Sequence, residues 1–467
     1  MWTAEKLARF VARSSYDDIP PAARQKAIDT IANNVGNIFA ALQHPQPKMV
    51  LKVAEEIGGK PQSTAVGLST RVGAQTAAYI NAILCDSLQN QDIVIPPTAH
   101  VWQFVEPAAL AMAEACGASG KELIAGLVLG VEICVRLGVN LKYHLESEVF
   151  GFGWSSVAAA AAAAKIAGLT EEQIAHAISL AAMNATVPCV HMACNTHGYL
   201  RQPNEIGAPS QTAIVSAWMA KGGYISPLDV FDSRGAFHKM MGCEDLNIPA
   251  LLDGLGKEWQ CTRSIFKFLP QCCLHFPAAE ATEAALKKGK FDLREIKNIR
   301  VRTLSWIAGK PFNDPRPEDI VQASLSLPLG VAASLLGIKP LWRWMDADVF
   351  RSPEVREVMA KITIEGAPEF DEPFRNGYQN IGASVELVTD RSAASETVHL
   401  QLDSYKIQRM VDLQGFFRGV STPRLDKKAC EEFLASLQRL PEIANVRELT
   451  EFLLKVQSLE PAVSAAG

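Results

Sequence analysis

The sequence predicts a mainly α-helical protein, with a large all-helical domain and a smaller α+β lid domain inserted before the C-terminal helices. Apolar residues repeat at the helical period from residue 3 to about 260, short alternating segments rich in Val, Ile and Thr follow, and the helical period returns near 423. We therefore expect a helical domain built from residues 1–262 and 411–467, and a lid domain at 263–410.

The first helices are predicted from apolar stripes. In the first of them Leu7, Phe10 and Val11 fall on one face, and residues 23–42 continue the pattern after Pro20 and Pro21. Further along, seven consecutive alanines occupy residues 158–164. Alanine has the highest helix propensity and lets neighbouring backbones approach closely, so this run predicts a central, tightly packed helix.

The lid domain is predicted from four strand-like segments, at residues 297–305, 360–366, 383–389 and 396–402. A helical stretch at 320–337 lies between the first two. Clefts between two such domains are common locations of small-molecule sites. We therefore look for the site where the two domains meet.

Composition excludes several classes of function. The chain has 467 residues and a formal net charge of −5, with charges of both signs interleaved, so neither nucleic acid nor a membrane is an expected partner. The ten cysteines lack the paired spacing of metal sites, and free cysteines indicate a reducing, cytoplasmic location. Phosphate-binding, serine-hydrolase and zinc-protease motifs are missing from the sequence, so we expect no cofactor and no metal.

The stretch LQNQDIVIPPTAHVW, residues 88–102, places polar side chains between apolar neighbours. Asn and Asp are common in caps and turns, so the stretch could simply terminate helices. Alternatively, polar groups that converge in an apolar cavity line a binding pocket. His100 has an ordinary pKa near neutrality, which suits a proton donor or acceptor.

The stretch KFLPQCCLHFP, residues 267–277, gathers Lys267, Cys272, Cys273 and His275. Two adjacent cysteines and a histidine two positions later do not easily surround a tetrahedral zinc ion, and a nucleophilic cysteine lacks an identifiable orienting partner. Structural packing with His275 facing a pocket is the favoured interpretation.

A second irregular stretch, residues 191–207, contains Arg201 and Gln202. The fork of Arg201 could pair with a substrate carboxylate, or the residue could lie on the surface.

Taken together, these segments resemble the MmgE/PrpD family, which includes 2-methylcitrate dehydratase, cis-aconitate decarboxylase and iminodisuccinate epimerase. The resemblance spans nearly the whole chain and is most specific over AAYINAILCDSLQNQD and the helices that follow His100. Other segments, including AKIAGLTEEQIAHAISLAA, KFLPQCCLHFPAAEA and DIVQASLSLPLGVAASLLG, follow in the family's order. It implies a helical domain with a lid, a homodimer without metal, and a site between the domains.

The resemblance departs from the family pattern at the site. The family's Asp-x-Asp-Asp-Thr run corresponds to residues 89–93, where Gln, Asn and Gln precede Asp92 and Ile93. His100 matches a family histidine, whereas a second family histidine falls on Gly153. The family lysine falls on Gln202, beside Arg201, and the family tyrosine falls near Trp306 or Ile307.

Three functions remain open. The first is a divergent dehydratase- or decarboxylase-like lyase acting on an organic acid, with His100 as the principal acid or base, assisted by Asp92 or His275. The second is an isomerase or cyclase acting on a larger, less charged biosynthetic intermediate, because replacing Asp by Gln deletes a proton acceptor. The third is a non-catalytic ligand-binding protein. The expected substrate-binding residues are Gln89, Gln91, Ile93, Trp102, Trp154, Arg201, Gln202, Lys267, Cys272 and Trp306.

Overall fold

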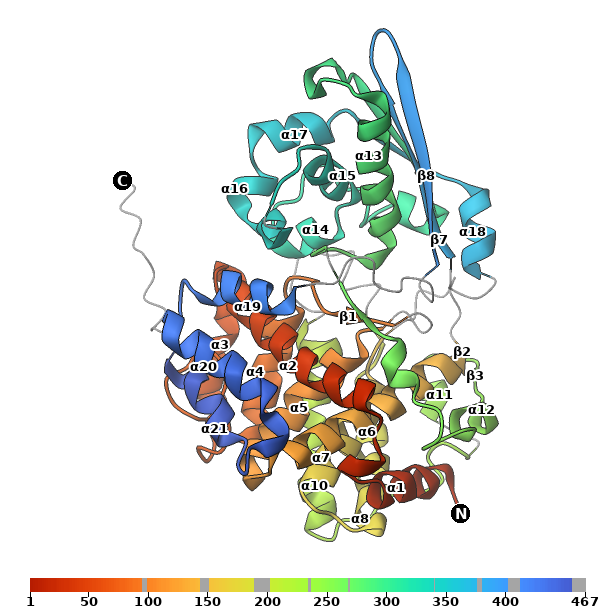
Figure 1. Cartoon of the computed structure of the whole chain (residues 1–467). Coiled ribbons are helices and arrows are strands. Elements are labelled where there is room, and N and C mark those ends of the chain that lie inside the picture. Colours follow the sequence, from red (N-terminus) through yellow and green to blue (C-terminus); the bar gives the residue numbers. More distant parts are fainter. Residues whose placement is uncertain are drawn as a thin grey trace.

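Most of the chain before residue 260 folds into helices that pack on one another, as the apolar stripes predict (Figure 1). The computed structural model describes residues 1–94, 99–142, 151–188, 202–233, 237–267, 269–339, 341–375, 380–401 and 412–455. The helices of this part are α1 (Thr3–Arg13), α2 (Pro21–Ala41), α3 (Pro45–Ile57), α4 (Ala74–Asp86), α5 (Val101–Cys116), α6 (Gly120–Asn140), α7 (Ser155–Ile166), α8 (Glu171–Met183), α10 (Ala208–Lys221), α11 (Phe237–Met240) and α12 (Ile248–Leu252).

Helix α7 lies at the centre of this helical domain, and it contacts α5, α6, α8 and α10. All seven alanines of residues 158–164 are fully buried. On the facing side of α6, a side chain at Gly130 would place its Cβ only 2.8 Å from both Ala158 O and Ala162 Cβ. The predicted central helix is therefore confirmed, and small residues on both helices allow the close approach.

The smaller domain, at the top of Figure 1, contains a four-stranded sheet in the order β6-β5-β7-β8. Strand β5 pairs in parallel with β6 and antiparallel with β7, and β7 pairs antiparallel with β8. Helix α13 packs against β7, β8 and α15. The strands are β5 (Asn298–Thr303), β6 (Ile362–Gly366), β7 (Asn380–Val388) and β8 (Ala393–Gln401), so the four predicted strands are confirmed with small shifts of their ends.

The helices of the smaller domain are α13 (Phe276–Gly289), α14 (Ile320–Leu325), α15 (Leu327–Leu335), α16 (Ala347–Phe350), α17 (Pro353–Met359) and α18 (Pro368–Arg375). The helical stretch that the sequence predicts at 320–337 is divided in two at Ser326. The Ser326 side chain accepts a hydrogen bond from the Leu329 backbone N–H, and Pro328 occupies the first turn of α15. These two features start a new helix there.

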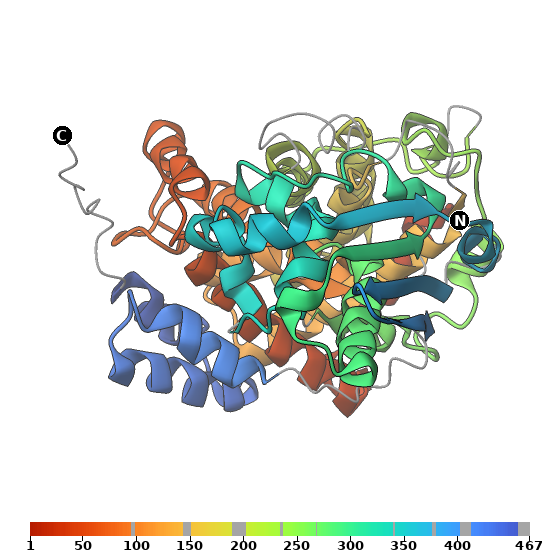
Figure 2. The ribbon, with the colours of Figure 1, turned by 90° about the horizontal axis from the view of Figure 1, so that it is seen from above.

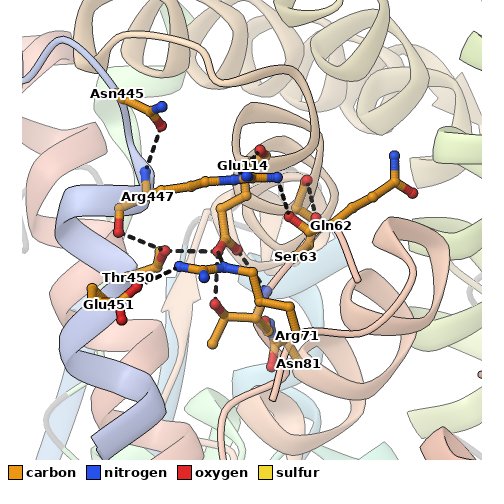
Figure 3. Close-up of polar contacts among 11 residues, drawn as sticks. Gln62, Ser63, Arg71, Asn81, Glu114, Asn445, Arg447, Thr450 and Glu451 are labelled. Atoms are coloured by element: carbon orange, nitrogen blue, oxygen red, sulfur yellow. Dashed lines mark hydrogen bonds and ion pairs between the residues drawn. The ribbon is translucent and has the colours of Figure 1, made fainter. Parts of the chain in front are cut away.

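After the smaller domain the chain returns to the helical one, in α19 (Leu413–Ser421), α20 (Lys427–Gln438) and α21 (Arg447–Thr450). Helices α19 and α20 contact α2, and the three blue helices lie beside the red and orange ones in both views (Figures 1 and 2). A buried carboxylate, Glu114, accepts a hydrogen bond from Thr450 Oγ1 at 2.7 Å (Figure 3). The mainly helical fold class, with an α+β part before the C-terminal helices, is thus confirmed.

Two short strands connect the domains, and the sequence did not predict them. Strand β1 (Asp92–Ile93) pairs antiparallel with β4 (Ile265–Phe266), with Asp92 opposite Phe266. A second short pair, β2 (Leu141–Lys142) with β3 (Asp245–Leu246), lies within the helical part. The β1–β4 pair places the chain that enters the smaller domain directly against the polar stretch around residue 90.

Candidate functional site

Lys267 is the centre of the polar cluster at the domain junction. It directly follows β4, it is fully buried, and its backbone N–H donates to Gln91 O at 3.0 Å. The ammonium donates to Gln89 O at 3.0 Å, to Gln89 Oε1 at 3.4 Å and to Gln91 Oε1 at 3.2 Å. The structure therefore brings together three residues that the sequence predicts at the site, from segments that are far apart in the chain.

Gln89 has an unusual backbone conformation. Its φ of 54° lies in the left-handed region, which residues other than glycine adopt only at a cost. In this conformation both the carbonyl and the side-chain oxygen of Gln89 face the Lys267 ammonium. The strained turn is therefore associated with binding of the buried cation.

Asp92 anchors the start of α5. Its two carboxylate oxygens accept the backbone N–H groups of Trp102 at 3.2 Å and Gln103 at 3.1 Å. Burial raises the pKa of Asp92 to about 7, while these two N–H groups and the charges of Lys26 and Lys267 act in the opposite direction. Because both oxygens are engaged with the helix terminus, the geometry favours a positioning role for this carboxylate over proton transfer.

His100 directly precedes α5, and its Nδ1 lies 2.7 Å from Asp92 O. A carbonyl oxygen only accepts, so in the neutral imidazole the proton is on Nδ1, and Nε2 is the atom that can take up a proton. The ring lies 6.0 Å from the ring of Phe104 and 6.5 Å from that of Phe152, measured between centroids. These contacts fix the orientation that a general acid or base requires.

His275 lies in the turn before α13 and is fully buried. Neither ring nitrogen has a hydrogen-bond partner among the described residues. Burial, and secondarily the charge of Lys267, lower the pKa of His275 to about 3, so its imidazole is neutral. The ring meets Phe312 edge to face at 5.6 Å, and Phe312 in turn meets the predicted residue Trp306 at 5.7 Å.

Of the two cysteines next to His275, Cys273 lies in surroundings that disfavour a thiolate. The Cys272 backbone N–H donates to Ser324 O at 3.2 Å, and its side chain is half-buried. A hydrogen bond with Cys272, together with burial, raises the pKa of the Cys273 thiol far above its ordinary value. A thiol in these surroundings is a poor nucleophile.

Four apolar residues that the sequence predicts as pocket-lining have different surroundings. Trp102 is fully buried, and its indole N–H donates to Ser264 Oγ at 2.7 Å, so it packs beneath the segment before β4. Ile93 is buried in β1, whereas Trp306 is 49% exposed. Trp154 is fully buried among aromatic rings, and its indole N–H has no partner among the described residues. Among the described residues, Trp102, Trp154 and Trp306 thus have different neighbours.

The position of the second family histidine is closed to any side chain. A Cβ on Gly153 would lie 2.1 Å from Thr186 O, well inside the distance that real Cβ atoms show. Gln202 begins the π-helical turn Gln202–Gly207 before α10, but its side chain is not described. Arg201 lies outside the described residues.

Asp86, the last residue of α4, was not predicted as a site residue. It is fully buried, and its Oδ1 accepts hydrogen bonds from Gln91 Nε2 at 2.8 Å and from Gln103 Nε2 at 3.1 Å. The polar run that drew attention to this region begins three residues later, at Gln89. A single acid at the end of an apolar helix is common and does not by itself indicate a site.

A layer of amides lies beneath the site. Asn37 Nδ2 donates to Asn90 O at 3.0 Å, and Asn34 Nδ2 donates to Glu106 Oε2 at 3.0 Å. Asn33 also belongs to this face of α2. The sequence could have indicated this layer, because three asparagines within five residues of a predicted apolar helix are unusual.

Among the described residues no cluster of three or more His, Cys, Asp or Glu side chains could hold a metal ion. The same residues contain no helix with the length and apolar composition of a membrane span.

A surface cavity of about 540 Å³, lined by Gln62, Cys116, Glu122, Trp218 and Lys221 among others, holds none of the predicted site residues.

The fold and the site define a two-domain, mainly helical protein with a buried lysine and a histidine where the domains meet. The chain belongs to the MmgE/PrpD family: the MmgE/PrpD N-terminal domain matches residues 5–248, and the MmgE/PrpD C-terminal domain matches residues 270–435.

Similar proteins include the cis-aconitate decarboxylase-like protein oryM of Aspergillus oryzae, which is 24% identical over 398 residues, covering 79% of this chain and 81% of that protein. Mouse cis-aconitate decarboxylase is 24% identical over 413 residues, covering 83% of this chain and 80% of that protein. Human cis-aconitate decarboxylase is 24% identical over 403 residues, covering 81% of this chain and 79% of that protein.

Proposed function

We propose that this protein is a lyase that decarboxylates or dehydrates an organic acid between its two domains. The observation that carries the proposal is the fully buried Lys267 ammonium, held by the oxygens of Gln89 and Gln91. A buried cation is stabilised by an anionic ligand, and a carboxylate is the anion that both reactions require. The family and the names of the relatives support the same class of reaction.

Both reactions develop negative charge next to a carboxylate. In decarboxylation the C–C bond to the leaving carboxylate breaks, carbon dioxide departs, and its electron pair stays on carbon until that carbon is protonated. In dehydration a base removes a proton beside a carboxylate, a C=C bond forms, and the hydroxyl takes up a proton from an acid and leaves as water. Lys267 is suited to stabilise that charge, because a fixed cation in a buried site acts at low dielectric.

His100 supplies the proton transfer in this proposal. Its Nδ1–H is held by Asp92 O, so Nε2 can accept a proton as the neutral base or return one as the imidazolium. Asp92 holds this arrangement through the first turn of α5. The neutral His275 imidazole offers a hydrogen-bonding group to the ligand from the smaller domain.

Turnover assays test the proposal. Purified protein is incubated with cis-aconitate, citrate and 2-methylcitrate, and carbon dioxide release and proton NMR of the products are followed. Lys267→Met is expected to lower kcat/KM by about 100-fold or more, as for loss of a group that stabilises a transition-state charge. His100→Ala is expected to lower kcat by ~100-fold or more while the circular dichroism spectrum is kept.

Lys165→Met is the matched control, because this half-buried lysine also donates to a backbone carbonyl, Ala12 O at 3.0 Å, but lies at the end of α7. It should retain the wild-type rate. Wild-type protein that converts none of these acids, or a Lys267→Met variant that keeps full activity, would refute the proposal.

A further inference from the structure

The amide of Gln91 connects a buried acid to a buried base. Its Nε2 donates to Asp86 Oδ1 at 2.8 Å and to Asp86 O at 3.0 Å, and its Oε1 accepts from Lys267 Nζ at 3.2 Å. The direction of the amide is fixed chemically, because an ionised carboxylate only accepts and an ammonium only donates. All three side chains are fully buried.

We propose that Gln91 is a positioning residue that sets the selectivity of Lys267 for a substrate carboxylate. Its amide donates to Asp86 at one end and accepts from the Lys267 ammonium at the other, so Asp86 fixes the amide that holds the ammonium. The proposal rests on the proposed function, in which Lys267 binds that carboxylate.

A neutral amide does something here that a carboxylate cannot. The oxygen end of its dipole favours the protonated form of the lysine and holds the ammonium in place, yet it adds no opposing charge of its own. A carboxylate at the same position would form a contact ion pair with Lys267 and compete with the substrate for the same cation. Gln103 helps to hold the Asp86 carboxylate in place, because Gln103 Nε2 donates to the same oxygen, Asp86 Oδ1, at 3.1 Å.

The side chain of Gln91 can be changed without removing the backbone contact at this point. Lys267 N–H donates to the backbone carbonyl of Gln91 at 3.0 Å, and any residue at this position keeps that carbonyl. Substitutions at position 91 therefore test the amide itself.

The experiment compares binding of tricarballylate, an unreactive saturated tricarboxylic acid, with binding of its trimethyl ester by isothermal titration calorimetry. Gln91→Glu is expected to weaken binding of the acid by tenfold or more and to leave binding of the ester unchanged. The matched control is Gln25→Glu, because Gln25 Nε2 also donates to an aspartate, Asp29 Oδ1 at 2.9 Å, but on the exposed face of α2. This control should keep the wild-type ratio of acid to ester affinity.

A second variant covers the case in which Gln91→Glu fails to fold. Gln91→Met has a similar shape but offers the ammonium no acceptor. Loss of an acceptor disfavours the protonated lysine, so binding of the acid should disappear at a lower pH than in the wild type. A residue that only supports the fold would lower the melting temperature without moving this pH profile.

The outcomes separate the two proposals. If Lys267→Met abolishes the preference for the acid but Gln91→Glu and Gln91→Met keep the wild-type ratio and pH profile, the role of Gln91 is refuted and the proposed function stands. If Lys267→Met keeps the preference for the acid, the proposed function fails, and the role of Gln91 fails with it because Gln91 acts through Lys267.

Discussion

Three buried oxygens beneath the site lack a hydrogen-bond donor among the described residues: Asn34 Oδ1, Gln103 Oε1 and Glu106 Oε1. Glu106 is the one residue of the three whose donors depend on pH, because its carboxylate becomes a donor only by taking up a proton. Burial raises the pKa of Glu106 to about 7, against the hydrogen bond from Asn34, which lowers it. Protonation removes the charge of this buried carboxylate and turns one of the unpaired acceptors into a donor, and an unpaired buried acceptor costs about 1–3 kcal/mol.

This protonation predicts a specific pH dependence of stability. In the unfolded chain Glu106 ionises near its ordinary pKa of 4.5, whereas in the fold it ionises at about 7. The unfolded state therefore binds fewer protons between these values, and the contribution of Glu106 to the free energy of unfolding is lost as the pH rises from about 4.5 to 7. The Glu106→Gln side chain carries N–H donors at every pH. The free energy of unfolding of this variant, minus that of the wild type, should therefore rise by on the order of 3 kcal/mol between pH 5 and pH 8.

Urea unfolding of both proteins at pH 5, 6, 7 and 8 measures this difference. The exposed Glu448→Gln variant is the control, and its difference from the wild type should stay constant with pH. A constant difference for Glu106→Gln as well would mean that Glu106 is ionised throughout.

At the level of single residues, the sequence predicted the side chains but not their roles. The Gln-Asn-Gln-Asp run and His100 were identified because they interrupt apolar neighbours, and the structure shows Gln89 and Gln91 contacting Lys267. The sequence could not predict that the Trp102 indole N–H donates to Ser264 Oγ, because that contact joins residues 162 positions apart in the chain. Asp86 was missed because its importance depends on contacts made by side chains from other segments.

At the level of elements, a buried acid fastens the last helices to the helical domain. Glu114 Oε1 accepts from Thr64 Oγ1 and from Thr450 Oγ1, each at 2.7 Å, and Arg447 Nε donates to Glu114 O at 2.9 Å (Figure 3). Thr450 and Arg447 belong to α21, whereas Thr64 and Glu114 come from the first quarter of the chain. The C-terminal return of the chain therefore depends on polar contacts as well as on apolar packing.

Removal of one of these contacts should weaken the whole helical domain. Thr450→Val keeps the shape of the side chain but deletes a donor to a buried carboxylate, so we expect the free energy of unfolding to fall by about 1–3 kcal/mol. Thr363→Val, on the exposed side of β6, is the matched control and should change stability by less than ~0.5 kcal/mol. Equal stability of the two variants in urea unfolding would contradict this role of Glu114.

Elements were predictable where the pattern is local. The alanine run predicted α7 correctly because its high helix propensity and its burial both favour a helix along the whole run. The alternating segments predicted the four strands of the sheet. The strand pair β1–β4 was missed because each strand has only two residues, and their pairing joins segments more than 170 residues apart in the chain. The break at Ser326 was missed because the apolar pattern runs through it.

At the level of the whole molecule, the β1–β4 pair brings the polar stretch around residue 90 next to the segment that enters the smaller domain. Asp92 and His100 come from the helical domain, and Lys267 and His275 follow β4 on the way into the smaller one. The sequence left two substrates open: an organic acid, as the family resemblance implies, or a less charged compound, because the family lysine falls on Gln202. The buried Lys267 ammonium is the observation from which the proposed function argues for the acid.

A ligand that bridges this junction should stabilise both domains together. In a thermal-shift titration we expect cis-aconitate, citrate, 2-methylcitrate or itaconate to raise the melting temperature, and uncharged polyketide-like or terpenoid compounds to leave it unchanged. A ligand present at a hundred times its dissociation constant stabilises the fold by about 2.7 kcal/mol, which is readily measured. Hydrogen exchange should slow at residues 89–93 and 265–267 in the same complex. Stabilisation by neutral compounds alone would favour an isomerase or cyclase, and would assign the Lys267 cluster a structural role.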